Sequence, residues 1–212
     1  MPLLPPVYPL VDVDLCRARR LDPLAVLAAL IEGGARFIQL RDKDPSSGAR
    51  LARADAAVAL ARSAGARLIV NDRADLARLA GADGVHVGQE DLAVDDVRRI
   101  VGPAAIVGVS THDEAQVAAA VRTSATYIAV GPIYGTLSKD TGYTARGLAL
   151  VRHAARASAL PVVAIGGITL ERAPEVIAAG AASVAVISDL LTGGDPAART
   201  RAFLDGLSER RV

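Results

Sequence analysis

Eight short apolar runs divide the chain, and polar or glycine-rich clusters follow them. The apolar residues within each run are continuous rather than alternating, which is typical of parallel strands buried on both faces. Alanine-rich segments with helical spacing lie between the runs. The pattern therefore predicts alternating strands and helices, with strands over residues 7–11, 37–41, 68–71, 84–87, 106–109, 127–131, 162–165 and 183–187.

This order predicts one (β/α)8 barrel domain over residues 1–212, with a doubly wound open sheet as the alternative layout. A chain of 212 residues is long enough for one such domain, and no linker-like change of composition interrupts it. Thr111 and Glu114 have the spacing of a capping box, which predicts a helix start directly after the fifth strand. Glycines stand where helices should end, at Gly33, Gly34, Gly65, Gly81 and Gly180.

Charge and cysteine content exclude several classes of partner. The net charge is +1 and basic residues are scattered among acidic ones, so nucleic acid is not expected to bind. No run is long and apolar enough to span a membrane, and the proline-rich start lacks the basic region of a signal peptide. The single Cys16 cannot form an internal disulfide and is expected to serve packing. We expect a cytoplasmic protein.

Two polar clusters near the C-terminus suggest a phosphate site. Gly166 and Gly167 follow the seventh strand, and Ile187 and Ser188 follow the eighth. In barrels, backbone N–H groups after these two strands often cradle a phosphate, and glycine lets the main chain approach its oxygens. A plain turn would also explain the glycine pair, but its position favours phosphate binding.

A second anion site is predicted from basic residues at other strand ends. Arg41 and Lys43 alternate along one strand end and so project to the same side, and Lys139 follows the sixth strand. Asp72 and Asp91 follow neighbouring strands. Each carboxylate alone would be read as an ordinary ion-pair partner. Together with the basic residues they indicate Mg²⁺ bridging a diphosphate, since Mg²⁺ uses one or two carboxylates plus phosphate oxygens.

Neutral hydrogen-bonding groups also occupy strand ends. Gln39, Asn71 and Ser110 could orient a polar heterocycle or a phosphate oxygen, or could merely satisfy loop backbone. His86 ends a buried strand and is expected to be structural. His112 lies near a helix start, where the positive end of the helix dipole favours the neutral imidazole.

The ordered series of motifs resembles the thiamine phosphate synthase family. The matching segments run from about Tyr8 to the last strand and include residues 39–43, 71–73, 84–92, 108–110, 131–134, 136–139 and 165–168. The resemblance implies a barrel transferase that joins 4-amino-2-methyl-5-hydroxymethylpyrimidine diphosphate to 4-methyl-5-(2-phosphooxyethyl)thiazole, or its carboxylated form. It also implies a dissociative reaction in which pyrophosphate leaves before the thiazole nitrogen attacks, so no strong general base is needed. Such barrels commonly form homodimers.

The resemblance also implies roles for individual residues. Asp72 and Asp91 would bind Mg²⁺. Arg41, Lys43, Ser110 and Lys139 would be catalytic and would hold the pyrimidine diphosphate together with Gln39 and Asn71. The thiazole phosphate would be held by Thr136, Ser138, Gly166 or Gly167, Ile187 and Ser188.

Two departures leave alternatives open. Ser138 stands where a second threonine is usual, which keeps the hydroxyl. Residues 142–148 resemble the related thiazole tautomerase branch, which shares the fold and isomerises the carboxylated thiazole phosphate, and there His112 would be the acid/base. A non-catalytic barrel that only binds thiazole or thiamine phosphates is a third interpretation. The complete segment from His86 to Asp91 and the predicted metal ligands favour the synthase.

Overall fold

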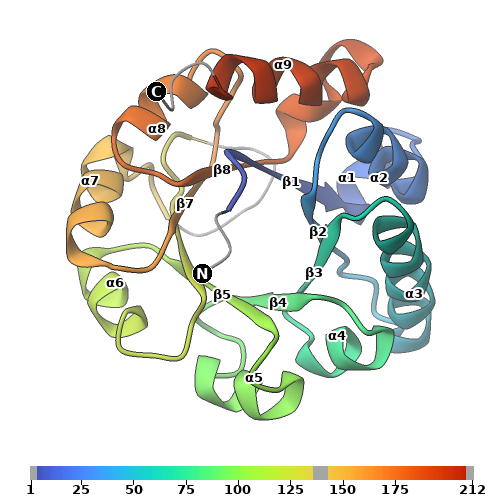
Figure 1. Cartoon of the computed structure of the whole chain (residues 1–212), viewed down its shortest axis with the longest axis horizontal. Coiled ribbons are helices and arrows are strands. Elements are labelled where there is room, and N and C mark those ends of the chain that lie inside the picture. The colour runs from blue at the N-terminus through green and yellow to red at the C-terminus, as the bar shows by residue number, and fades with distance from the viewer. Residues whose placement is uncertain (1–3, 136–142, 209–212) are drawn as a thin grey trace.

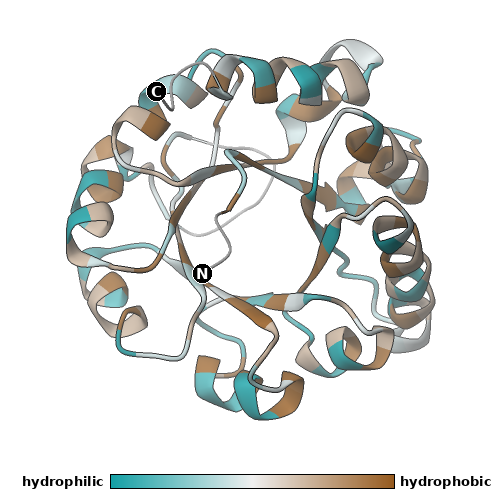
Figure 2. Cartoon of the chain, in the orientation of Figure 1, coloured by the Kyte–Doolittle hydropathy of each residue, from teal (hydrophilic) through white to brown (hydrophobic). Residues whose placement is uncertain are grey.

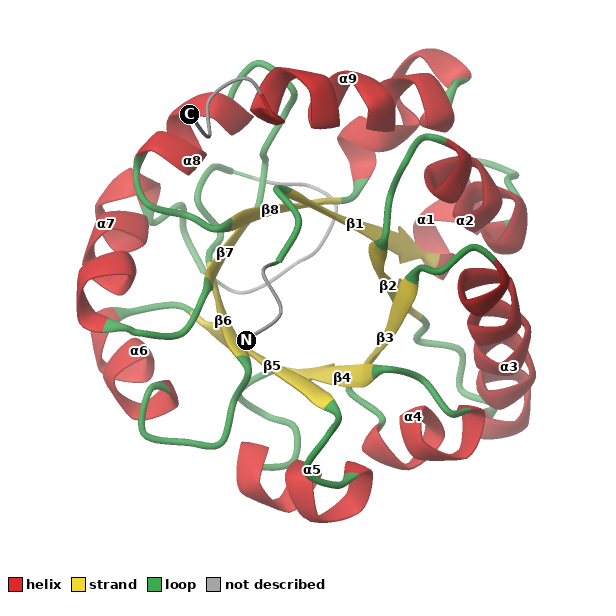
Figure 3. Cartoon of the chain, in the orientation of Figure 1, coloured by secondary structure: helices red, strands yellow, loops and turns green. Residues whose placement is uncertain are grey.

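The computed structural model describes residues 4–135 and 143–208, which form a closed barrel of parallel strands. Each strand pairs with the next one along the chain, and β8 pairs with β1. Figure 3 shows the ring of strands with the helices outside it. The strands are β1 (Val7–Asp12), β2 (Phe37–Arg41), β3 (Arg67–Asn71), β4 (Gly84–Val87), β5 (Ile106–Thr111), β6 (Tyr127–Val130), β7 (Val162–Ile165) and β8 (Ser183–Val186).

Helices follow the strands and surround the barrel (Figure 1). They are α1 (Val13–Ala18), α2 (Pro23–Glu32), α3 (Ser47–Ser63), α4 (Ala74–Ala80), α5 (Val94–Val101), α6 (Glu114–Ala120), α7 (Gly147–Ala157), α8 (Ala173–Ala178), the short 3₁₀ helix η1 (Ser188–Gly194) and α9 (Pro196–Ser208). The (β/α)8 barrel expected from the apolar runs is confirmed, and the open-sheet alternative is wrong because β1 and β8 close the ring.

Two apolar cores stabilise this arrangement. The larger core lies between the strands and the surrounding helices, and Figure 2 shows hydrophobic residues in both. The smaller core fills the barrel itself and includes Tyr8, Phe37, Ile69 and Tyr127. Cys16 belongs to the larger core, where burial raises the pKa of its thiol to about 11, so it remains a protonated packing residue as expected.

Strand alternation places the polar side chains at one end of the barrel. Because successive residues of a strand point to opposite faces, Gln39 and Arg41 both point inward from β2. The parallel register then aligns Asn71 with His86, and Ser110 with Ala129, on neighbouring strands. The carboxyl ends of the strands thus bring together side chains that are far apart in the chain.

The predicted start of α6 needs correction. Thr111 does not cap the helix but ends β5, fully buried, and its hydroxyl donates to the carbonyl oxygen of Ala129 at 3.0 Å. Asp113 is the N-cap instead, because its carboxylate accepts from the backbone N–H of Gln116 at 2.8 Å. Capping-box spacing alone cannot tell a strand-end threonine from a cap two residues later.

The predicted helix ends are confirmed at the glycines. Gly34, Gly65, Gly81 and Gly180 all have positive φ, the left-handed conformation that glycine adopts most readily. Within the described residues, no helix combines the length and apolar character needed to cross a membrane.

Candidate active site

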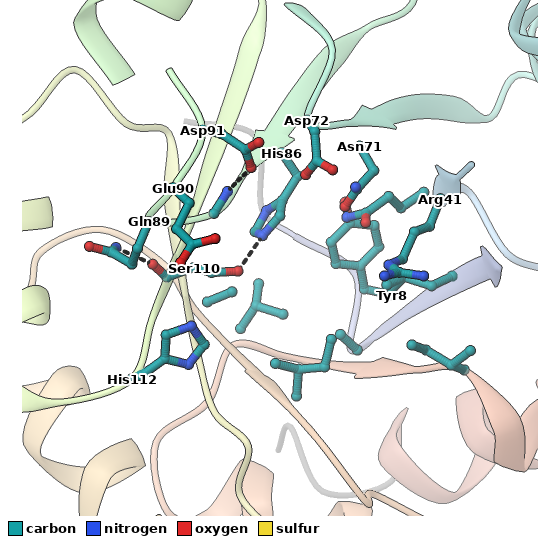
Figure 4. Close-up of a pocket in the computed structure, with 18 of the residues that line it drawn as sticks. Tyr8, Arg41, Asn71, Asp72, His86, Gln89, Glu90, Asp91, Ser110 and His112 are labelled. Carbon is teal, nitrogen blue, oxygen red and sulfur yellow. Dashed lines mark hydrogen bonds between the residues drawn. The ribbon is translucent and has the colours of Figure 1, made fainter. Parts of the chain in front are cut away.

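Two cavities lie side by side at the carboxyl ends of the strands. The first, which we call the central cavity, has a volume of about 250 Å³ and is shown in Figure 4. The second, which we call the β8 cavity, has a volume of about 500 Å³. Both are lined by the same five residues where they meet, namely Ser110, His112, Ile165, Ala185 and Ile187. A group bound in one cavity therefore lies next to a group bound in the other.

The structure divides the residues proposed from the sequence between these cavities. Thr136, Ser138 and Lys139 lie outside the described residues. The β8 cavity is lined by Ser110, Gly166, Gly167, Ile187 and Ser188. The central cavity is lined by Gln39, Arg41, Lys43, Asn71, Asp72, Asp91 and Ser110.

Arg41 is held in the central cavity by a carboxylate that sequence reasoning did not identify. Its guanidinium donates to Asp12 at 2.5 Å, and the other carboxylate oxygen of Asp12 accepts from the backbone N–H of Leu15 at the start of α1. Asp12 is only 3% exposed, so this pair is largely removed from water. The Nε atom of Arg41 is buried without a hydrogen-bond partner among the described residues. An anion in the cavity could supply that acceptor.

Lys43 and Asp72 form an ion pair beside Arg41. Asp72 directly follows β3 and has a φ of 64°, a left-handed conformation that is uncommon outside glycine. Its backbone N–H donates to the carbonyl oxygen of His86 at 2.7 Å, which fixes this conformation against the neighbouring strand. The backbone turn thus places a carboxylate at the rim of the cavity at some conformational cost.

A short loop after β4 carries the second carboxylate, Asp91. Its carboxylate accepts from the backbone N–H of Gly88 at 2.7 Å, and Gln89 donates from the same loop to the carbonyl oxygen of Ser110 at 2.6 Å. Partial burial raises the pKa of Asp91, and the neighbouring Asp72 carboxylate raises it further, although the Gly88 hydrogen bond acts in the opposite direction. The two carboxylates are therefore close enough to repel each other.

Such a pair fits Mg²⁺ in combination with a phosphorylated ligand. A divalent cation between Asp72 and Asp91 would relieve the repulsion that raises the pKa of Asp91. In residues 4–135 and 143–208, no group of three or more His, Cys, Asp or Glu side chains is arranged to hold a metal ion. The remaining ligands would have to be water and phosphate oxygens, which is how Mg²⁺ is commonly bound.

Buried polar residues connect Ser110 with the opposite side of the barrel. The Nε2 atom of His86 lies 2.9 Å from the hydroxyl of Ser110, and its Nδ1 atom lies 2.9 Å from the hydroxyl of Tyr127. Tyr127 in turn contacts Tyr8 at 3.0 Å, and Gln39 donates to Tyr8 at 2.8 Å. His86 was expected to be structural. It also lines the central cavity and contacts Ser110, a residue proposed to bind the pyrimidine diphosphate. These contacts could not be predicted from the sequence, because the residues that make them are far apart in the chain.

The glycine pair after β7 is required by close packing of the backbone. Gly166 and Gly167 have φ values of 105° and 63°. A Cβ atom on Gly166 would lie 2.6 Å from the Cα of Pro132, and one on Gly167 would lie 2.5 Å from the carbonyl oxygen of Gly135. The turn alone therefore explains both glycines, and it also exposes their backbone to the β8 cavity.

His112 occupies the junction of the two cavities. Its Nδ1 atom lies 2.6 Å from the carbonyl oxygen of Gly131, and because a carbonyl oxygen can only accept, Nδ1 is the donor in this contact. The ring stacks on Tyr143 at 4.0 Å between centroids. Sequence reasoning did not foresee Arg19 and Arg172, two cations that line the β8 cavity.

Comparison with known proteins connects this site to one family. A sequence model described as "Thiamine monophosphate synthase" matches residues 7–190. A thiamine-phosphate synthase of Roseiflexus castenholzii is 47% identical over 204 residues, covering 96% of this chain and 89% of the relative. A thiamine-phosphate synthase of Methanoculleus marisnigri is 44% identical over 206 residues, and the alignment covers 97% of both chains.

A solved structure agrees with these sequence relatives. The thiamine phosphate pyrophosphorylase of Pyrococcus furiosus superposes with a TM-score of 0.86 at 30% sequence identity. The superposition covers 96% of this chain and 95% of the other. The likeness in fold therefore extends over nearly the whole chain.

Proposed function

Because the chain belongs to the thiamine monophosphate synthase family, we propose that its two cavities hold the two phosphorylated substrates of that reaction. The chain is a transferase of thiamine biosynthesis, a thiamine-phosphate synthase. One observation above all supports placing one substrate in each cavity: the central cavity, which is rich in charged groups, and the β8 cavity, beside the glycine pair, share one wall. Two substrates that must be joined need such adjacent places.

The central cavity would hold the pyrimidine diphosphate. Arg41 and Lys43 supply positive charge for the diphosphate, and the unpaired Nε of Arg41 supplies a further donor. Gln39, Asn71 and Ser110 supply neutral groups for the pyrimidine ring and for one diphosphate oxygen. Lys139 would add to this set on the strength of the family resemblance alone, because it lies outside the described residues.

Asp72 and Asp91 would hold Mg²⁺ against the diphosphate. When bound, Mg²⁺ stabilises the negative charge that develops on the departing pyrophosphate. The ion pair of Lys43 with Asp72 keeps both residues beside that position. Burial raises the pKa of Asp91 most and the neighbouring Asp72 carboxylate adds to it, and this second contribution supports the assignment.

The β8 cavity would hold the thiazole phosphate. The backbone of Gly166 and Gly167 and the residues that follow β8, Ile187 and Ser188, line it. Barrels often bind phosphate at this place, after strands seven and eight. Thr136 and Ser138 would complete the site by resemblance to the family.

The placement would serve the dissociative chemistry that the resemblance to the family implies. The bond between the pyrimidine methylene carbon and the diphosphate oxygen breaks, and the bonding electrons leave with pyrophosphate. The thiazole nitrogen then donates its lone pair to the resulting cationic carbon and forms the new carbon–nitrogen bond. The nitrogen carries no proton, so no general base has to remove one. The chain's own task is to hold both substrates at the shared wall and to stabilise the leaving group.

The alternatives of the sequence analysis are distinguished by products. The experiment incubates the purified protein with both phosphorylated precursors and Mg²⁺ and then measures thiamine phosphate and pyrophosphate. We expect the two products in equal amounts. A parallel incubation with the carboxylated thiazole phosphate alone tests for the tautomerase reaction. A protein that only isomerises this compound, or that binds both precursors without turnover, would contradict the proposal.

We also propose that the chain forms a single domain over residues 1–212. We further propose that the protein is cytoplasmic and forms a homodimer. Within residues 4–135 and 143–208, the strands close into one barrel that the helices surround, which supports a single domain. The lone Cys16 is compatible with a reducing compartment. Sedimentation of the purified protein would test the homodimer.

A further inference from the structure

Five polar side chains from five strands form a continuous hydrogen-bonded row across the inside of the barrel. In order they are Gln39, Tyr8, Tyr127, His86 and Ser110, and the successive distances are 2.8, 3.0, 2.9 and 2.9 Å. All except Ser110 are buried. Both ends of the row, Gln39 and Ser110, line the central cavity, and Figure 4 shows the His86 end.

The strand packing makes room for this row. Gly108 on β5 lies against Tyr127 and His86, and a Cβ atom at this position would come within 2.1 Å of the Tyr127 ring and 2.6 Å of the His86 Nδ1 atom. The two rings stack with centroids 5.6 Å apart. Glycine at this position is therefore needed for the contact between Tyr127 and His86, which is the middle link of the row.

The row has one consistent direction of hydrogen bonding. Burial raises the pKa of Tyr8 and of Tyr127, so each keeps its single hydroxyl proton. Gln39 donates to the Tyr8 oxygen, and among the described residues the Tyr127 oxygen is the acceptor within reach of the Tyr8 proton, so we take Tyr8 to donate to Tyr127. The Tyr127 proton then has the Nδ1 atom of His86 as its acceptor. A neutral His86 must therefore carry its proton on Nε2 and donate to the oxygen of Ser110.

We propose that Tyr8, Tyr127 and His86 are positioning residues that set the hydrogen-bonding polarity of the central cavity. The row leaves the Ser110 proton as a donor toward the cavity and the Gln39 amide oxygen as an acceptor. The preferred ligand has an N–H donor, as an aminopyrimidine does, at the Gln39 end and an anionic oxygen or ring nitrogen at the Ser110 end. This inference rests on the proposed placement of the pyrimidine diphosphate in the central cavity.

The direction of the row can be tested without substrate. The ¹⁵N chemical shifts of the imidazole nitrogens distinguish the two neutral tautomers of each of the three histidines. His112→Asn and His153→Gln assign the signals by elimination. We expect the proton of His86 on Nε2 in the wild type, and a mixture of tautomers in Tyr127→Phe. A wild-type protein with the proton on Nδ1, or on both nitrogens at neutral pH, overturns the proposal, independently of which substrate the cavity binds.

A double-mutant cycle tests whether Tyr127 acts through Ser110. We expect Tyr127→Phe to slow pyrophosphate release in a single turnover about tenfold, the effect of losing one well-made hydrogen bond, and to leave the KM for thiazole phosphate unchanged. In the Ser110→Ala background the same change should have an effect of about twofold or less. An equal loss in both backgrounds shows a merely structural role and overturns the proposal.

A matched control uses a tyrosine outside the row. The hydroxyl of Tyr134 donates to Glu175 on α8 rather than to any member of the row. Tyr134→Phe should therefore leave both the His86 tautomer and the single-turnover rate unchanged. If Tyr127→Phe does not fold, the tautomer measured in the wild type still decides the proposal.

Discussion

Asp12 at the end of β1 accepts a hydrogen bond of 2.5 Å from the guanidinium of Arg41 at the end of β2. The same carboxylate caps α1 through the N–H of Leu15 at 2.9 Å. One buried acid therefore fixes both a helix start and the cation expected to meet the diphosphate.

Asp12→Asn should separate these two tasks. Asparagine still caps a helix, but it removes the negative charge opposite Arg41. We expect the free energy of unfolding to fall by about 2 kcal/mol and the KM for pyrimidine diphosphate to rise. Urea unfolding and steady-state kinetics measure the two effects. Asp14→Asn is the control, because Asp14 is exposed and lies 3.8 Å from Arg17, and it should change neither quantity.

Asp72→Asn and Asp91→Asn should each reduce synthesis about a hundredfold while the fold stays intact, because a lost transition-state contact of this kind costs about 3 kcal/mol. Initial rates at limiting Mg²⁺ measure the effect, and circular dichroism checks the fold. Asp75→Asn provides a control of the same charge change in α4, where the carboxylate pairs with Arg73. Normal turnover by either cavity variant would remove that residue from the metal site.

The raised pKa of Asp91 predicts how stability depends on pH and Mg²⁺. A folded carboxyl with a raised pKa is favoured in its protonated form, so its ionisation costs stability as the pH rises through that pKa. Mg²⁺ with pyrophosphate should offset this cost and raise the Tm at about pH 8, and the gain should fade in acid. Thermal unfolding measures it, and Asp91→Asn controls for protonation of pyrophosphate itself. A gain that is the same in wild type and variant would refute the assignment.

Lys139→Ala should slow the chemical step more than it weakens thiazole phosphate binding. The ammonium is assigned to the departing diphosphate, whose charge grows as the bond breaks. Single-turnover rates and thiazole phosphate affinity measure the two effects separately. A large loss of affinity with an unchanged rate would assign Lys139 to the β8 cavity instead.

His112→Asn should keep much of the thiamine phosphate activity, because capture of a cationic carbon needs no titratable group. An asparagine amide can also replace the Nδ1 donor that lies 2.6 Å from the carbonyl oxygen of Gly131. Thiamine phosphate formation by the variant and by the wild type measures this. Complete loss in the variant, together with isomerisation of the carboxylated thiazole by the wild type, would support the tautomerase instead.

The fold could be predicted from the sequence because its signals are local. Each strand is a largely continuous apolar run, and several helices end at or next to a glycine, as α4 does at Gly81, so neighbouring residues carry the information. The charged rim could also be predicted, since Arg41 or Asp72 directly follows an apolar run. The start of α6 was mistaken because Thr111 and Asp113 are both good caps and only packing decides between them.

The interior of the site could not be predicted in the same way. Tyr8 and Tyr127 are separated by 119 residues and meet only because the barrel closes. The role of His86 depends on its partners in β5 and β6, which the segment around it does not reveal. Asp12 was overlooked because nothing in its own segment indicates that Arg41 lies beside it.

The wall shared by the two cavities affects which product is made. Three of its residues, Ile165, Ala185 and Ile187, are aliphatic and offer water few hydrogen-bonding partners. A carbon that has lost pyrophosphate would react with water as well as with the thiazole nitrogen. Aliphatic side chains at this junction therefore favour transfer over hydrolysis of the pyrimidine diphosphate to its alcohol. Their contribution should appear in the ratio of coupled product to alcohol rather than in the overall rate at which pyrophosphate is released.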